Sequence, residues 1–168
     1  MEGHRRYLPG VNRKLDGCYL DNDNWCFEIV PPVKPFHAEN AVNGIARAGA
    51  DKTNMWISSP ALPQWLELDF GGEKNIGKAE LIFDTNLDKP CYRGIPAECV
   101  RDYELQSLTD GQWQTVVKVS GNRMRRRLHT FDPVRTEKLR LMITATNGDP
   151  CARVYEFRAW EAETVKEA

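Results

Sequence analysis

The chain has 168 residues, and its 23 Lys and Arg balance 24 Asp and Glu, which gives a formal net charge of −1. This length fits one domain with a hydrophobic core of its own. The near-zero charge argues against a protein that binds nucleic acid or anionic membranes, and no apolar run approaches the roughly 18 residues of a membrane span.

The N-terminal part of the chain predicts a lead-in segment followed by strands. Residues 1–20 are polar and irregular, and they lack the apolar stretch of a signal peptide, so we expect a linker here. Residues 25–30 resemble a strand that stops at two prolines. Residues 64–70 alternate strictly and end at Gly71-Gly72, with Leu66, Leu68 and Phe70 on one face and Trp65, Glu67 and Asp69 on the other.

Further short extended runs follow, separated by turn signals such as Asp110-Gly111. Helical periodicity never persists for ten residues, and the strands are too close together for the crossovers of a parallel sheet. This spacing predicts an all-β sandwich or barrel over 21–160, with a frayed charged tail over 161–168. The predicted strands cover 78–83, 100–108, 113–119, 125–131, 138–144 and 152–160.

The chemistry-bearing motifs of common enzyme classes are absent from the sequence. There is no glycine-rich dinucleotide or phosphate loop, so we expect no flavin or nucleotide in this chain. No nucleophile elbow occurs, and the chain has only three His. Short strands that carry polar loops are typical of a scaffold that presents loops, which favours a binding module over an enzyme.

The five cysteines do not form a zinc pattern or a disulfide framework. Cys91 and Cys99 lie in one loop rich in Pro and Gly, and they could close it as a small disulfide. The alternative is that the cysteines are buried or half-buried free thiols.

Three segments together carry a resemblance to a known family. They are Glu-Asn-Ala-Val-Asn-Gly-Ile at 39–45, Asn-Met-Trp-Ile-Ser at 54–58 and Gln-Trp-Leu-Glu-Leu-Asp-Phe-Gly at 64–71. In this order they resemble the discoidin, or coagulation-factor type C, domains, and the similarity extends over roughly 20–160. The resemblance implies an antiparallel jelly-roll β-sandwich of the galactose-binding type. Bacterial members of the family are mostly carbohydrate-binding modules appended to larger enzymes.

A narrower resemblance rests on 83–87, 99–103 and 146–153. These segments look like the C-terminal discoidin-like domain found behind some bacterial FAD-dependent oxidoreductases. Since this chain has no flavin fingerprint, that resemblance would place any redox chemistry in a partner domain.

The family resemblance places the ligand on loops at one end of the sandwich, here 33–40, 49–63, 86–96 and 147–151. A sugar site needs an aromatic face for the ring and fixed donors and acceptors for the hydroxyls. Tyr92 beside Arg93 is the best such pair, although Tyr92 could instead plug its own loop and Phe36 could pack beneath its loop. The candidate carbohydrate contacts are Tyr92, Arg93, His37, Phe36, Asn86, Asn147 and Asp149.

The resemblance also implies a structural Ca²⁺ in the loop after the first strand. Asn43 stands where many members have Asp, Asp51 and Thr53 lie in the same loop, and Glu156 matches a glutamate of the last strand. Hard cations favour such oxygen ligands. The alternative is that Glu156 pairs with a nearby Arg.

Two further groups have structural interpretations. Trp56 and Trp65 match core positions of the family, and Trp113 and Trp160 lie in predicted strands, so we assign all four to structure. The basic run 123–127 is split by strand alternation, and we expect ion pairs with neighbours such as Asp102 or Glu104 rather than a polyanion site.

These observations predict a non-catalytic carbohydrate-binding domain whose partners are a glycan and a catalytic domain on the same parent chain. Such a setting would be extracellular or periplasmic. The first alternative is a structural accessory domain of a flavoenzyme or glycoside hydrolase that binds no sugar, which an exposed apolar patch away from the loops would favour. A lipid- or protein-binding domain ranks third, with loop-tip candidates Phe36, Leu62 and Leu87.

Overall fold

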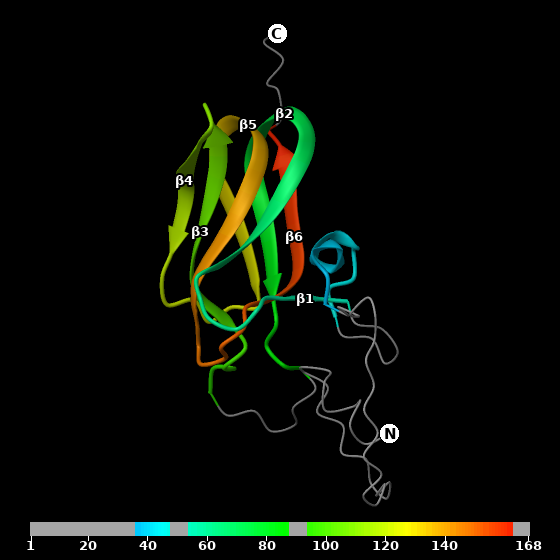
Figure 1. Ribbon diagram of the computed structural model, residues 1–168, viewed down its shortest axis with the longest axis vertical. Coiled ribbons are helices and arrows are strands. Elements are labelled where there is room, and N and C mark those ends of the chain that lie inside the picture. The colour runs from blue at the N-terminus through cyan, green and yellow to red at the C-terminus, as the bar shows by residue number, and fades with distance from the viewer. Residues whose placement is uncertain (1–35, 48–53, 88–93, 163–168) are drawn as a thin grey trace, which may run out of the picture. The chain divides into compact units, whose positions relative to one another are not determined.

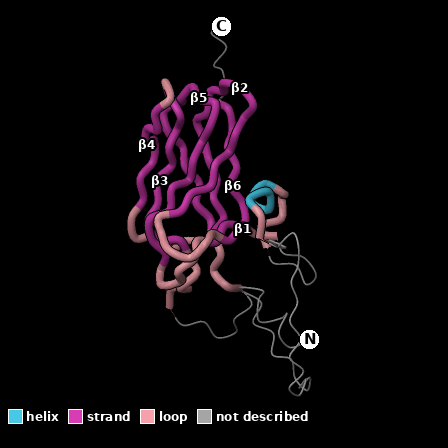
Figure 2. The backbone as a smooth tube through the Cα atoms, viewed as in Figure 1, coloured by secondary structure: helices cyan, strands magenta, loops and turns pink. Residues whose placement is uncertain are grey.

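The computed structural model describes residues 36–47, 54–87 and 94–162. Every strand pair in it is antiparallel, and the predicted all-β class is confirmed. Figures 1 and 2 show one short helical turn beside the strands. The elements are η1 (Ala38–Val42), β1 (Trp56–Ile57), β2 (Gln64–Phe83), β3 (Val100–Thr109), β4 (Gln112–Val119), β5 (Arg126–Thr146) and β6 (Arg153–Glu161).

Two long bent strands, β2 and β5, build both layers of the sandwich. The first half of β2 pairs with the second half of β5, and β3 and β4 extend that layer. The second half of β2 pairs with the first half of β5, and β6 and β1 extend the other layer. The strand order β1-β6-β2-β5-β3-β4 therefore folds over on itself, which gives the jelly-roll β-sandwich.

The bend lies where the sequence predicted an end. We expected the strand 64–70 to stop at Gly71-Gly72, but β2 continues through both glycines to Phe83. The register with β5 shifts between Asp69 and Lys74, and Gly71 has φ +69°, a conformation that costs glycine little. The glycines therefore redirect one strand into the other layer instead of ending it.

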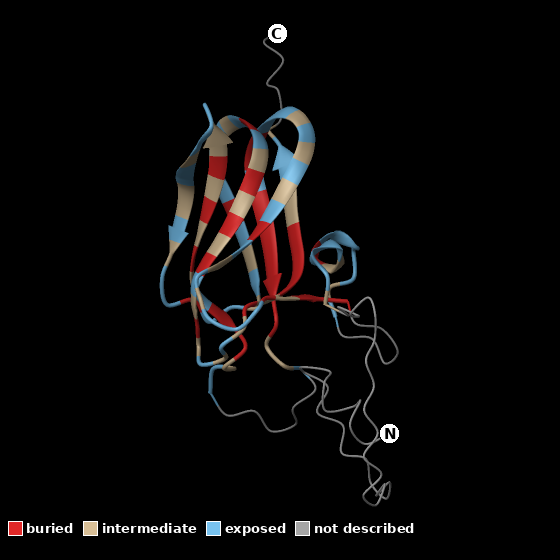
Figure 3. Cartoon of the chain, viewed as in Figure 1, coloured by how far each residue is buried: buried red, intermediate tan, exposed pale blue. Residues whose placement is uncertain are grey.

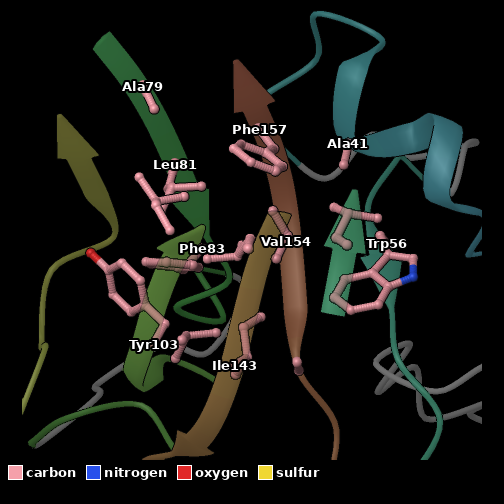
Figure 4. Packing of buried hydrophobic residues seen from close by; sticks show 14 of the residues in the cluster. Ala41, Trp56, Ala79, Leu81, Phe83, Tyr103, Ile143, Val154 and Phe157 are labelled. Atoms are coloured by element: carbon pink, nitrogen blue, oxygen red, sulfur yellow. The ribbon is translucent and has the colours of Figure 1, made fainter. Parts of the chain in front are cut away.

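The core fills the space between the two layers, and one face of the strand 64–70 contributes to it. Leu66 is buried, and Leu68 and Phe70 pack against the same cluster. In Figure 3, buried residues alternate with less buried ones along β3 and β5. The rings of Phe83 and Tyr103 meet at a centroid distance of 5.2 Å, and Figure 4 shows them facing each other in the core.

A smaller cluster lies on the outer face of the layer that contains β6. Met55, Ile82 and Tyr155 form it, and Phe36 and Ala46 pack against them. Asn40 Nδ2 also donates to Met55 O at 3.1 Å. These contacts attach the segment around η1, which the sequence did not predict as helical, to the sandwich.

The core position predicted for Trp56 is confirmed and the one predicted for Trp65 is wrong, while Trp113 and Trp160 lie in strands as predicted. Trp56 is 9 % exposed and belongs to the core, whereas Trp65 is 53 % and Trp160 38 % exposed. Alternation places Trp65 opposite Leu66, on an outer sheet face that no described element covers. Trp113 is half-buried, and the Arg140 guanidinium stacks on its ring at 4.0 Å.

Candidate functional site

Three loops, β2–β3, β4–β5 and β5–β6, gather at one end of the sandwich, which we call the loop end. It consists of the described residues 84–87, 94–99, 120–125 and 147–152, which follow or precede the strands that terminate there. Figure 1 shows these loops together at the lower end, opposite the bend of β2. The described part of the loop end includes three of the predicted carbohydrate contacts, Asn86, Asn147 and Asp149.

Side-chain and backbone hydrogen bonds join these loops. The Asn147 amide donates to Cys99 O at 2.9 Å and to Asn122 O at 3.2 Å. Asp149 N donates to Ala97 O at 3.0 Å. Three loops that are distant in sequence are thus held as one unit, so side chains on them have fixed relative positions.

A buried charge cluster lies under this unit. Arg153 Nη2 is 2.7 Å from Asp149 Oδ2, and Arg153 Nη1 is 3.6 Å from Asp84 Oδ2. All three side chains are at most 12 % exposed. Burial raises the pKa of Asp84, while the Asn86 N–H and the Arg153 charge act in the opposite direction. The two carboxylates therefore share the Arg153 guanidinium as an ion-pair partner.

Asn86 links this cluster to the loop surface. Its backbone has φ +50°, which Asn tolerates better than most residues, and its N–H donates to Asp84 Oδ1 at 2.8 Å. Its Nδ2 donates to Glu98 Oε1 at 2.6 Å. Asn86 thus braces the loop end through its donors.

Apolar side chains project from two of the three loops, β2–β3 and β4–β5. Leu87 is 62 %, Met124 58 % and Ile95 39 % exposed. Each stands beside the hydrogen-bonded unit rather than in the core. The loop end therefore combines fixed polar groups with exposed apolar surface, a combination that suits a ligand with both kinds of face.

The remaining predicted contacts lie elsewhere or outside the described residues. His37 is exposed and precedes η1, where its carbonyl accepts the Asn40 N–H at 3.2 Å. Phe36 packs against the cluster of Met55, Ile82 and Tyr155, as its alternative interpretation proposed. Tyr92 and Arg93 lie outside the described residues.

Arg125, which the sequence analysis did not single out as a site residue, connects the η1 segment to the loop end. It donates to Ala46 O and, at 3.3 Å, to Phe83 O. Its guanidinium also lies 4.9 Å from the ring centre of Tyr155. One side chain therefore holds the η1 segment against the end of β2.

The prediction that the basic run 123–127 forms ion pairs with Asp102 or Glu104 is wrong. Arg126 pairs with the buried Glu80 across the sheet. Glu104 pairs with Lys118 at 2.8 Å and Asp102 with its neighbour Arg101 at 3.0 Å. Register, which the sequence does not fix, decides these partners.

Of the four candidate metal ligands, Glu156 and Asn43 can be described. The Glu156 side chain is fully buried, and its Oε2 accepts from Arg158 Nε at 2.9 Å. Its Oε1 has no hydrogen-bond partner among the described residues. Asn43 Oδ1 accepts the Ile45 N–H at 2.8 Å, and Asp51 and Thr53 lie outside the described ranges. Across the described chain, no three His, Cys, Asp or Glu side chains gather into a metal cluster.

Cys99 is a free and fully buried thiol, whereas Cys91 lies outside the described residues. Burial, helped by the nearby Asp84 charge, raises the pKa of Cys99 to about 11. The thiolate form is therefore scarce at neutral pH, and this cysteine is inert.

Comparison with family models gives one match. The model of the F5/8 type C domain matches residues 32–157. No curated protein sequence matches the chain. No helix in the described part of the chain is long and apolar enough to cross a membrane.

Solved structures of similar fold include three carbohydrate-binding modules. The family 32 module of Streptococcus pneumoniae EndoD has a TM-score of 0.64 at 19 % identity, covering 78 % of this chain and 89 % of that one. The family 32 module of C. perfringens NanJ, solved with galactose, has 0.59 at 20 %, covering 76 % and 86 %. Chitosan-binding module 2 from Paenibacillus sp. IK-5, solved with chitotriose, has 0.60 at 18 %, covering 76 % and 88 %.

Proposed function

The chain belongs to the F5/8 type C domain family, and on this basis we propose that it is a non-catalytic carbohydrate-binding domain whose ligand site is the loop end. The observation that carries the proposal is the composition of that end. Asn147 and Asp149 lie in a braced unit, and Leu87 and Met124 project beside it. Asn147 and Asp149 fix the loops in place, and a saccharide would cover Leu87 and Met124 with its C–H faces while its hydroxyls meet polar groups of the same loops.

Two further observations support the proposal. The structural relatives named above are carbohydrate-binding modules, two of them solved with galactose or chitotriose. The solved structure of SpGH29, with a TM-score of 0.60, is much longer, since this chain covers only 25 % of it. We therefore extend the proposal to a module that forms part of a larger enzyme and brings it to a glycan.

A glycan array followed by calorimetry tests the function, with galactose and chitotriose as the first soluble probes. The test variants are Tyr92→Ala and Asn86→Ala, and the matched control is Trp65→Ala, which removes an exposed aromatic from a sheet face instead. We expect Tyr92→Ala to weaken binding by about tenfold, or about 1.4 kcal/mol, at unchanged melting temperature.

The control variant should bind like the parent. The function is contradicted if the folded parent chain binds no glycan on the array. The assignment of the site is contradicted if binding occurs but neither Tyr92→Ala nor Asn86→Ala changes it.

We also propose a structural Ca²⁺ held in part by Glu156. What supports it is the fully buried carboxylate whose Oε1 lacks a hydrogen-bond partner among the described residues. A buried charged oxygen in this state is costly unless a cation completes its environment. Asn43, Asp51 and Thr53 would supply further oxygens, and the ion would act by stabilising the fold.

Calorimetric melting with EDTA and with added Ca²⁺ tests the ion separately from the glycan. We expect EDTA to lower the melting temperature and Ca²⁺ to restore it, because a ligand that binds only the folded state stabilises it. Glu156→Gln should remove this Ca²⁺-dependent increment. A melting temperature that responds to neither reagent would rule the ion out.

The second candidate function is a structural accessory domain that binds no sugar. It is favoured by exposed apolar side chains on the body of the sandwich, away from the loop end: Val42, Ile45 and Leu128 are 55 %, 45 % and 51 % exposed. A folded chain that binds no glycan on the array would favour this structural function over carbohydrate binding.

A further inference from the structure

The sequence contains two Asn-Gly pairs, and their surroundings in the structure differ. They are Asn43-Gly44, directly after η1, and Asn147-Gly148, in the β5–β6 loop. In such a pair the backbone nitrogen of the glycine can approach the side-chain carbonyl carbon of the asparagine, because glycine has no Cβ to hinder it. The two pairs therefore share one intrinsic reactivity, which the fold can suppress or leave free.

Asn147-Gly148 is held from several sides. The Asn147 Nδ2 donates to Cys99 O at 2.9 Å and to Asn122 O at 3.2 Å. The nitrogen that would have to attack, Gly148 N, donates its proton to Thr146 Oγ1 at 3.3 Å. Any rotation that brings Gly148 N to the Asn147 Cγ breaks these bonds, so the fold protects this pair.

Asn43-Gly44 has fewer restraints. Both residues are exposed, and Figure 3 colours most of the η1 segment in the same way. Asn43 Oδ1 accepts the Ile45 N–H at 2.8 Å, which is the one side-chain hydrogen bond of this asparagine within the described residues. A Cβ at Gly44 would meet nothing within 4 Å beyond the adjoining residues. The Asn43 ψ is −3°, so attack needs a rotation about its Cα–C bond and the loss of that one bond.

The reaction open to this pair consumes one water and releases ammonia. Gly44 N gives up its proton to water and bonds to the Asn43 Cγ. The bond between Cγ and Nδ2 then breaks, and Nδ2 takes up a proton and leaves as ammonia. The product is a five-membered succinimide ring that joins the side chain to the backbone. A water molecule opens one of the two carbonyl bonds of this ring, which leaves either an aspartate or an isoaspartate.

We propose that Asn43 is a site of spontaneous deamidation, at which the chain converts its own amide into a carboxylate, while the fold protects the same pair at Asn147. The product has one more negative charge at the exposed end of η1. Asn43 is also one of the oxygen donors proposed above for Ca²⁺, and Ca²⁺ affinity rises with the charge of the ligands. This consequence for Ca²⁺ rests on the proposed ion, whereas the modification does not.

Peptide mapping by mass spectrometry tests the modification on the whole folded chain, kept at neutral pH and sampled over several weeks. We expect the mass increase of an amide-to-acid exchange in the peptide that contains Asn43, with aspartate and isoaspartate both present. This exchange should be about tenfold faster than at Asn147, because rotation at Asn147 breaks two more hydrogen bonds. A chain unfolded in guanidinium chloride is the control, and in it the two rates should be similar.

The variant Gly44→Ala tests the route of the reaction. Its methyl group hinders the attacking nitrogen, so the exchange at Asn43 should slow by about tenfold while the exchange at Asn147 stays the same. The proposal is overturned if Asn43 stays unmodified, if the two asparagines react at equal rates in the folded chain, or if Gly44→Ala reacts as fast as the parent.

Melting with added Ca²⁺ addresses the consequence for the ion separately. Asn43→Asp should show a larger Ca²⁺-dependent rise in melting temperature than Asn43→Gln, which keeps a neutral amide. Equal rises would overturn the effect on Ca²⁺ and leave the modification standing. A melting temperature that ignores Ca²⁺ in both variants would overturn the proposed ion as well, and the mass spectra would still decide the modification.

Discussion

Replacing Arg153 by Met tests whether the charge cluster under the loop end holds the loops in place. The guanidinium is 11 % exposed and lies between the Asp84 and Asp149 carboxylates, at 6 % and 12 % exposure. Methionine keeps much of the volume but removes the ion-pair partner of two buried carboxylates, which leaves the Asn86 N–H and the Arg125 charge at Asp84 and the Cys151 N–H at Asp149. Breaking a buried ion pair from one side costs about 3–5 kcal/mol, a large share of the 5–15 kcal/mol that a typical domain has.

The stability lost in Arg153→Met should depend on pH, because the loss arises from an ionised carboxyl group. Burial raises the folded-state pKa of Asp84 above the unfolded value of about 4, and removing the Arg153 charge, which opposes this shift, raises it further, so the ionised form is penalised. The penalty is absent below that value and develops as pH rises through the folded-state pKa. Arg153→Met should therefore cost most at neutral pH and little near pH 4, and adding Asp84→Asn should recover part of the loss.

Urea denaturation followed by tryptophan fluorescence measures this free energy of unfolding. Arg101→Met is the matched control, because Arg101 is 49 % exposed in its pair with Asp102 and should cost no more than about 1 kcal/mol. The reasoning fails if Arg153→Met costs no more than the control. It also fails if the loss is the same at both pH values.

Two more predictions concern the core. Burial lowers the pKa of His129 below its usual 6.5, so the stability that the neutral ring provides is present above that value and is lost as pH falls. His129→Gln should therefore remove this loss of stability at acid pH, as measured by urea denaturation. An unchanged pH profile would contradict the prediction. Phe157→Ala should lower the free energy of unfolding by about 3–5 kcal/mol because the ring is fully buried. Val42→Ala is the control and should change stability little, because Val42 is 55 % exposed. Similar losses for the two variants in thermal melts would contradict the assignment of Phe157 to the core.

The sequence predicted most of the fold because its strands are amphipathic on a period of two. The alternation over 64–70 puts Leu66 and Trp65 on opposite faces, and the structure buries Leu66. The same pattern cannot say whether a covering element lies over the other face, which is why Trp65 was assigned wrongly. Gly71-Gly72 is equally compatible with a turn that ends the strand and with a bend inside it. The structure shows a bend, because β2 pairs with β5 on both sides of the glycines.

The candidate site was less accessible to sequence reasoning. Position in the family pattern was enough to place Asn86, Asn147 and Asp149 on loops that meet. Arg125 and Arg153 were missed as bracing residues, because their partners are set by the fold: Arg125 bonds to Phe83, 42 positions away, and to Ala46, 79 positions away. A run of arginines carries no signal that distinguishes a brace from a solvated cation.

The shared strands also determine how the domain responds to mechanical load. β6 runs from Arg153 at the loop end to Glu161 at the opposite end, and it is paired with β2 over Ile76–Phe83. Hydrogen bonds in an antiparallel pair lie across the strands, so tension along β6 shears many of them together instead of opening them one by one. Since β2 belongs to both layers, that tension is passed to the whole sandwich. A force applied between a ligand bound at the loop end and residue 162 would therefore deform the domain little.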